Sequence, residues 1–324
     1  MRLSRLIVSL MMLGLLSKPI LSLANPVPNP VQPNAFDETR AFDLLKKYVQ
    51  FGNRYYQAPK RAAAIQLLVD DLKMRGLQVE IQNFEQLETQ SKINYPLTNI
   101  IGRLNPTSPY RVILGTHWDT RLWAEEDQNQ QDREKPIQGA NDGTSGIAVL
   151  LEMAQLFKTQ SFNQIGVDLV FFDGEEFGRP GSNDYCAGSR YFAKNINRFY
   201  QHYPIAVIIL DMVGDQQLEI PFEQSSLAKA KPLTELLWQE AKKLGKTSFS
   251  QRIGPWITDD HSPFQDLGIQ SILLIDYDYA HWHTHQDDIS KCSPKSLKDT
   301  GEVVMQTLIK LDQIIQQQQK NDLK

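Results

Sequence analysis

Cysteine is scarce in this sequence. Only Cys186 and Cys292 occur among 324 residues, and two cysteines are too few for a disulfide framework or for a metal site built entirely from thiolates. The sequence leaves open whether they pair with each other, because it does not give the separation of their Cα atoms. Any bound metal must therefore be held by histidine and carboxylate side chains.

The sequence also lacks a long basic run. Lysine and arginine total 34 against 38 aspartate and glutamate residues, which gives a formal net charge of −4. Nucleic-acid binding depends on a concentrated basic surface that displaces counterions from the phosphate backbone. The composition therefore disfavours a nucleic-acid partner. No coiled-coil heptad argues for a protein partner, so we expect a monomer.

An apolar segment long enough to span a membrane is missing as well. The apolar run of residues 6–16 follows two arginines and is shorter than the roughly 20 residues that a membrane-spanning helix needs. The small-x-small pattern Ser22-Leu23-Ala24 follows this run, and residues 1–24 together are typical of a secretory signal peptide. We therefore expect a periplasmic or secreted protein without a stable membrane anchor.

The rest of the chain divides into a spacer, one domain and a short tail. Residues 25–35 alternate proline with polar residues, a pattern typical of an extended polyproline spacer. Folding is expected to begin near Phe36. Residues 36–316 are interpreted as a single catalytic domain, and the polar tail 317–324 is expected to fray.

Hydrophobic periodicity predicts alternating helices and strands in this domain. Helical spacing of apolar residues occurs over 37–50, 60–75, 146–157, 233–244 and 297–315. Residues 77–84 alternate apolar and polar side chains, as in a half-buried strand. Continuous apolar runs, typical of strands buried on both faces, occur at 112–114, 167–172, 205–210 and 272–275. The order predicts an α/β fold, a three-layer αβα sandwich around a central mixed, mostly parallel sheet.

Ionisable residues follow each of the buried apolar runs. They are His117 and Asp119 after 112–114, Glu175 and Glu176 after 167–172, Asp211 after 205–210, and His281, His283 and His285 after 272–275. Asp142 lies just before the helix predicted over 146–157. Because ligands of open α/β sheets bind beyond the carboxyl ends of the strands, we expect these side chains to converge on one edge of the sheet.

This set of residue types suits a catalytic zinc site. Zinc prefers histidine nitrogen and carboxylate oxygen, and a catalytic site uses three protein ligands and keeps one position open. Asp142, Glu176 and His283 fit this rule, although Asp142 alone could be a turn or N-cap residue. Of two neighbouring carboxylates, one can ligate metal while the other, Glu175, transfers protons. Spacing alone does not choose between His283 and His285.

His117 and Asp119 are two residues apart, so at the end of a strand both face the same side. They could bind a second metal or form hydrogen bonds within the site. Asp259 begins a short stretch typical of a helix start, where a capping role is the simplest interpretation.

Seven motifs of the sequence occur together in a known order. They are THWDTR, GANDGTSGIAVLLEMA, DLVFFDGEEFG, CAGSRYFAK, ILDMVGD, TDDHSPF and WHTHQDD. Their order is that of the zinc-dependent exopeptidases of metallopeptidase clan MH, and they more closely resemble the animal-type glutaminyl-peptide cyclotransferases that are built on that fold and also occur in bacteria. The resemblance covers about residues 36–316. Trp282 directly before His283 favours the cyclases over the aminopeptidases.

The resemblance implies a reaction and a zinc site. N-terminal glutamine of a peptide or protein would be converted to pyroglutamate with release of ammonia. Asp142, Glu176 and His283 would bind one Zn²⁺ per chain, and Glu175 would be the general acid and base.

The resemblance also implies roles for residues around the zinc. Asp211 and Asp259 would form a supporting acidic hydrogen-bond pair, and Trp282 would line the substrate pocket. The segment 177–181 departs from the animal cyclases, in which this stretch contributes a second pocket tryptophan. The candidates to replace that tryptophan are Trp118, Trp123 and Trp256.

Two alternatives stay open at this point. A secreted aminopeptidase would use two zinc ions about 3.5–4 Å apart, with His117 and Asp211 as ligands of the second ion and Asp142 as the bridge. An inactive binding protein on the same fold is disfavoured, because every expected ligand and the acid/base residue are present.

Overall fold

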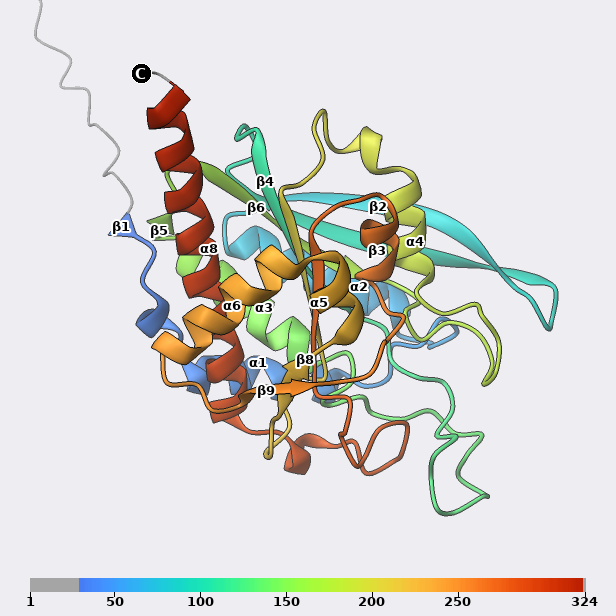
Figure 1. Ribbon diagram of the computed structural model, residues 1–324. Helices are drawn as coiled ribbons and strands as arrows, with labels where there is room; N and C mark the ends of the chain where they lie inside the picture. The colour runs from blue at the N-terminus through green and yellow to red at the C-terminus, as the bar shows by residue number, and fades with distance from the viewer. Residues whose placement is uncertain (1–28, 323–324) are drawn as a thin grey trace, which may run out of the picture.

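A six-stranded sheet in the order β10-β7-β4-β6-β3-β2 forms the centre of the computed structural model, which describes residues 29–322 (Figure 1). Four neighbouring strands run parallel: β10 (Ser271–Ile275), β7 (Ala206–Asp211), β4 (Tyr110–His117) and β6 (Ile165–Phe172). β3 (Ile93–Leu104) and β2 (Gln78–Glu88) form a long antiparallel hairpin beside β6, and its tip projects from one side of the molecule. The predicted mixed, mostly parallel sheet is confirmed.

The parallel strands form where the sequence has continuous apolar runs. Every residue of β6 and of β7 is buried, which requires helices on both faces of the sheet. Successive side chains along a strand point to opposite faces, so Val112 and Leu114 of β4 belong to one apolar core while Ile113 belongs to the other.

Helices cover both faces and complete the three layers. The larger core is covered by α1 (Glu38–Phe51), α2 (Arg61–Met74), α3 (Ser145–Phe157), α6 (Lys231–Lys243) and α8 (Pro294–Asp322). The smaller core is covered by α4 (Ala187–Lys194), the turn η2 (Ile196–Arg198) and α7 (Ser262–Asp266). The predicted αβα sandwich is therefore confirmed.

Smaller elements lie around this frame. The helix α5 (Gln224–Lys229) lies beside β10, where Leu273 N donates to Ser226 Oγ at 3.0 Å. A short parallel pair joins β8 (Ile220–Phe222) to β9 (Phe249–Ile253), and the turn η3 (Ile289–Lys291) precedes α8.

Three expectations about the fold need correction. The strand β1 (Asn29–Pro30) pairs with β5 (Gln160–Ser161), the turn η1 (Pro33–Ala35) follows, and Val31 is buried in the larger core. Residues 29–35, within the expected spacer 25–35, thus already belong to the fold, which was expected to begin near Phe36. The last helix continues past residue 315 to Asp322, because glutamine and lysine are good helix formers. No strand was predicted for β3.

The structure also bears on the two cysteines and on the expected lack of a membrane-spanning helix. Cys186 and Cys292 are both buried and unpaired. Among the helices of residues 29–322, none combines the length and the apolar character that crossing a bilayer requires. The expected signal peptide, residues 1–24, lies outside the described residues.

Gly301 tests how α8 packs against Phe36, which lies just before α1. A Cβ atom at Gly301 would overlap the ring of Phe36, which is buried. We expect Gly301→Ala to lower the free energy of unfolding by about 1–3 kcal/mol through overpacking, although alanine is otherwise about 1 kcal/mol better than glycine in a helix. Urea denaturation followed by circular dichroism measures the change.

The matched control is the same substitution in a Phe36→Ala background. Without the ring the overlap disappears, so Gly301→Ala should be neutral or stabilising there. An equal loss in both backgrounds would show that the ring is not the obstacle.

Candidate metal centre and active site

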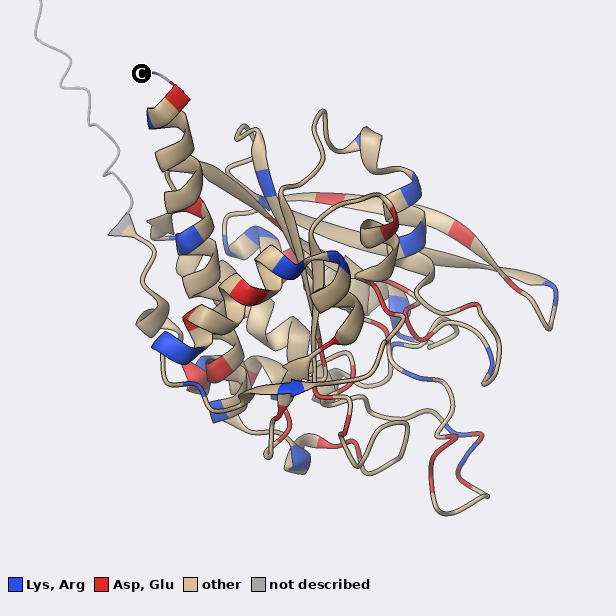
Figure 2. Cartoon of the chain, in the orientation of Figure 1, with Lys and Arg blue, Asp and Glu red and all other residues tan. Residues whose placement is uncertain are grey.

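Aspartate and glutamate residues gather in the loops beyond the carboxyl ends of the parallel strands, coloured red in the lower part of Figure 2. His117 ends β4, Asp211 ends β7, and Glu176 follows β6. Asp142 precedes α3, and His283 lies in the loop after β10. The structure thus brings together residues from five separate parts of the sequence, as their positions after the apolar runs predicted.

Asp142, Glu176 and His283 form a compact set of possible metal ligands. One atom of each lies within 4.8 Å of the others, and all three side chains are buried. His283 Nε2 lies 3.3 Å from Glu176 Oε1 and 3.7 Å from Asp142 Oδ2. Asp142 Oδ2 is buried without a hydrogen-bond partner in the described part of the chain. An orphaned carboxylate oxygen beside a second carboxylate and an imidazole fits a zinc ion.

Charge favours a cation at this position. Burial alone lowers the pKa of His283, but the carboxylates of Glu176, Glu125 and Asp142 raise it to about 10. Burial and the Glu176 carboxylate raise the pKa of Asp142 well above its ordinary value. The site therefore stabilises positive charge and destabilises further negative charge.

Asp142 is fixed through its own backbone. Asp287 accepts hydrogen bonds from Asn141 N at 2.8 Å and from Asp142 N at 3.2 Å, and it accepts a third from Tyr279 Oη at 2.8 Å. Gly143 follows with φ 85°, and a Cβ atom there would meet the main-chain oxygen of Asp119. Only glycine fits this turn without strain.

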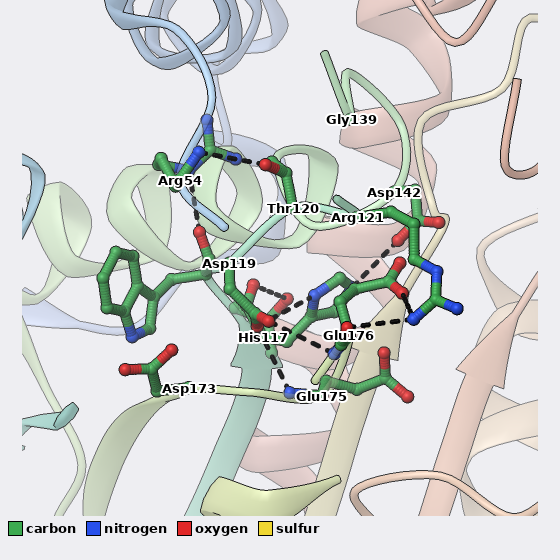
Figure 3. Close-up of polar contacts among 12 residues, drawn as sticks. Arg54, His117, Asp119, Thr120, Arg121, Gly139, Asp142, Asp173, Glu175 and Glu176 are labelled. Carbon is green, nitrogen blue, oxygen red and sulfur yellow. Dashed lines mark hydrogen bonds and ion pairs between the residues drawn. The ribbon is translucent and has the colours of Figure 1, made fainter. Parts of the chain in front are cut away.

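The two neighbouring glutamates are held by Asp119. Its carboxylate accepts from Glu175 N at 3.3 Å and from Glu176 N at 3.2 Å (Figure 3). Arg121 donates to Glu176 O at 3.0 Å, and its guanidinium lies 3.5 Å from Glu176 Oε2. Burial raises the pKa of Glu176, but His283 and Arg121 outweigh that effect and lower it below the usual range. Glu176 is therefore a stable anion.

Glu175 differs from its neighbour in electrostatic environment. Burial and the Glu176 carboxylate raise the pKa of Glu175 well above that of an ordinary glutamate. Cys186 Sγ donates to Glu175 Oε1 at 3.4 Å, and Asp259 lies within the same cluster. Two adjacent carboxyl groups with pKa values shifted in opposite directions are typical of a site that separates charge stabilisation from proton transfer.

His117 joins a second set of possible ligands that shares Asp142. Its Nε2 lies 3.0 Å from Asp211 Oδ1 and 3.2 Å from Asp142 Oδ1. Burial lowers the pKa of His117, but the neighbouring carboxylates of Asp119, Asp142 and Asp211 raise it well above its ordinary value. His117, Asp142 and Asp211 also place one atom each within 4.8 Å of one another.

Asp259 lies beside Asp211. Burial, together with the negative charge of Asp211, raises the pKa of Asp259 to about 7. Both acids line the same cavity, and the hydrogen-bond pair that the resemblance implies for them, with its catalytic role, stays a prediction.

The structure distinguishes between His283 and His285. His285 is exposed, and both its backbone N and its Nδ1 lie 3.0 Å from Asp127 Oδ2. His261 is a buried histidine paired with Ser225 Oγ at 2.8 Å. Of these three, only His283 contacts the carboxylates of Asp142 and Glu176.

A cavity of about 590 Å³ opens beside the ligand sets. Its acidic lining comprises Glu125, Glu126, Asp142, Glu175, Glu176, Asp211 and Asp259, and its aromatic lining comprises Phe177, Tyr185, Tyr277 and Trp282. The three tryptophans suggested as replacements, Trp118, Trp123 and Trp256, are not among the described residues that line it. Trp118 is buried behind the site, and Trp256 lies on the surface. The tyrosines at positions 185 and 277, which the sequence analysis did not name, provide aromatic walls instead.

The residues that hold the candidate metal-ligating side chains in place were not predicted from the sequence. Glu125 and Asp287 were given no role, yet each forms a hydrogen bond or ion pair with a candidate ligand residue. The only local signal was the acid-rich stretch 124–127 and the pair of aspartates after His285.

The sheet, the covering helices and the ligand sets define an α/β protein of the zinc exopeptidase fold with a candidate metal centre. The chain matches the model of peptidase family M28 over residues 99–308, and it belongs to this family. Its structural relatives include a Zn-dependent exopeptidase from Parabacteroides distasonis, with 31% identity and a TM-score of 0.81 over 85% of this chain and 98% of its own.

Relatives within the family include cyclases and peptidases. Glutaminyl-peptide cyclotransferase from Bos taurus is 26% identical over 268 residues, 72% of each chain. Glutaminyl cyclase from Porphyromonas gingivalis has 32% identity and a TM-score of 0.81 over 85% of this chain and 99% of its own. A leucine aminopeptidase precursor from Bacteroides thetaiotaomicron has 32% identity and a TM-score of 0.81 over 87% and 99%. The predicted resemblance to glutaminyl cyclases on the zinc exopeptidase fold is confirmed.

Replacing each histidine of the 283–285 pair tests the ligand assignment. We expect His283→Ala to lose most bound zinc, because it removes one of three ligands. His285→Ala should keep the wild-type zinc content, because that side chain binds Asp127 instead. Metal analysis of the purified variants measures both, and zinc loss in His285→Ala alone would contradict the assignment.

Proposed function

We propose that this protein is a glutaminyl-peptide cyclotransferase, which converts the N-terminal glutamine of peptides or proteins to pyroglutamate and releases ammonia. The observation that carries the proposal is the position of Glu175. Its carboxyl group lines the cavity directly beside the ligand set of Asp142, Glu176 and His283. The animal and bacterial relatives named as glutaminyl cyclases support the same reaction.

The reaction places modest demands on the protein. The nucleophile is the α-amine of the same glutamine whose side-chain amide is attacked, so tethering already supplies a high effective molarity. The cavity needs to hold the glutamine folded back on itself, with Trp282 as one wall. A zinc ion held by Asp142, Glu176 and His283 would polarise the amide carbonyl when bound.

Glu175 would move the proton. It would take one from the attacking amine and deliver it to the leaving amide nitrogen, which then departs as ammonia. Burial and the Glu176 carboxylate raise its pKa above that of an ordinary glutamate, which favours holding the proton between its acceptance and its delivery. Asp211 and Asp259, which line the same cavity, would support this exchange.

The free amine of the substrate sets the expected pH range. An α-amino group has a pKa of about 7.7–8.0, and only its neutral form can attack. Activity should therefore be high near pH 8 and fall as the pH is lowered.

A second candidate is a two-zinc aminopeptidase. The set formed by His117, Asp142 and Asp211 favours it, because these residues could hold a second zinc ion with Asp142 as the bridge. An aminopeptidase from Bacillus subtilis is 27% identical over 234 residues, although the alignment spans only 45% of that protein.

The remaining parts of the proposal rest on the sequence. We propose one zinc ion per chain, a monomer with a single catalytic domain that includes residues 36–316, and export to the periplasm or medium directed by residues 1–24. The natural partner is then an extracytoplasmic peptide or protein with an N-terminal glutamine.

A paired assay near pH 8 tests the function. We expect a glutamine-initiated peptide to lose ammonia, a leucine amide to stay intact, and metal analysis to give about one zinc ion per chain. Cleavage of the leucine amide together with about two zinc ions would establish the aminopeptidase instead.

Glu175→Gln and Glu176→Gln separate proton transfer from metal binding. Glu175→Gln should lower kcat by about 10²–10⁴-fold, because general acid–base catalysis contributes about that factor, and it should keep its zinc. Glu176→Gln should lose activity and zinc together. Unchanged turnover in Glu175→Gln would remove this residue from the mechanism.

A further inference from the structure

His283 contacts a carboxylate on each side of its ring. Nε2 faces the ligand set, 3.3 Å from Glu176 Oε1. On the other side Nδ1 lies 3.0 Å from Glu125 Oε1, an ion-pair contact that does not have the geometry of a hydrogen bond in the described part of the chain. The residue is buried, and its backbone has φ 52° in the left-handed region, which is rare for a residue with a side chain. The ring is thus held in one place between two acids.

Glu125 is itself held by Arg121. Arg121 Nε donates to Glu125 Oε1 and Oε2 at 3.0 and 3.2 Å, and Arg121 Nη2 donates to Oε1 at 2.7 Å. The same guanidinium donates through Nη1 to Glu176 O at 3.0 Å. One arginine–glutamate pair therefore contacts two of the three proposed ligand residues, His283 and Glu176.

The loop that carries Glu125 also holds the backbone of the histidine loop. Glu126 N donates to His283 O at 3.3 Å, and Asp127 binds His285. These contacts join segments that are far apart in the sequence and carry Glu125 to the outer side of the His283 ring.

A histidine that binds metal through one nitrogen must carry its proton on the other. An acceptor on the second nitrogen fixes both the tautomer and the orientation of the ring. We infer that Glu125 is a positioning residue that holds the His283 proton on Nδ1 and, through Arg121, ties His283 to Glu176. This inference rests on the ligand set of the proposed function.

The test is the zinc affinity of the full mature chain, measured by competition with a chelator. We expect Glu125→Ala to lower the affinity by about 10–100-fold, the range found for such supporting residues. Glu125→Gln keeps an oxygen that can accept from Nδ1–H but loses the charge that binds Arg121, so its affinity should lie between those of Glu125→Ala and the wild type.

Glu126→Gln is the matched control. It is a neighbouring cavity carboxylate in the same loop, its side chain is exposed, and its contact with His283 is through the backbone. Its zinc affinity should equal that of the wild type. An equal loss in Glu126→Gln, or wild-type affinity in Glu125→Ala, would overturn the inference.

Two further measurements separate positioning from folding and from catalysis. The metal-stripped Glu125→Ala protein should unfold at the same temperature as the metal-stripped wild type. If metal-stripped Glu125→Ala unfolds at a lower temperature, the zinc affinity of Glu125→Gln decides. An affinity between those of Glu125→Ala and the wild type supports the inference, and the wild-type affinity overturns it. Zinc affinity is measured without substrate, so this test of Glu125 remains valid even if the chain proves to be an aminopeptidase.

Discussion

Repulsion among buried carboxylates is the constraint that shapes this molecule. Four of them, Asp142, Glu176, Asp211 and Asp259, line one cavity at the edge of the sheet together with the half-buried Glu175. Removing several like charges from water costs several kcal/mol for each ion unless partners offset it. A buried arginine and two imidazoles contact these carboxylates, while backbone N–H groups bind Asp119 and Asp287 beside the proposed ligands. A bound cation would be a further partner.

The backbone donors explain why the site is built on loops that leave the strands. Asp119 and Asp287 each accept from two successive main-chain N–H groups beside a proposed ligand. Each therefore fixes a ligand residue without adding another side chain to the crowded cavity. Such indirect support leaves the ligand oxygens free to face inward, as the orphaned Asp142 Oδ2 does.

Much of this architecture could be predicted because its signals are local. The parallel strands coincide with unbroken apolar runs, and the proposed ligands follow directly after them. β3 was missed because its sequence, INYPLTNIIGRL, has neither a continuous apolar run nor regular alternation and contains a proline. Glu125 was missed for a different reason. Its partner His283 lies more than 150 residues away, and an acidic loop without periodicity gives no sign of what it will contact.

The last helix closes the fold around the beginning of the chain. α8 packs against α1 and the turn before it, Lys298 pairs with Glu38 at 3.1 Å, and Gly301 lies under Phe36. Contacts between residues so distant in sequence form late, because loop closure must come first. α1 also packs against α3, but the part of its apolar side that α8 covers stays exposed to solvent until residues 294–322 have been synthesised. During synthesis this uncovered surface favours aggregation until α8 docks.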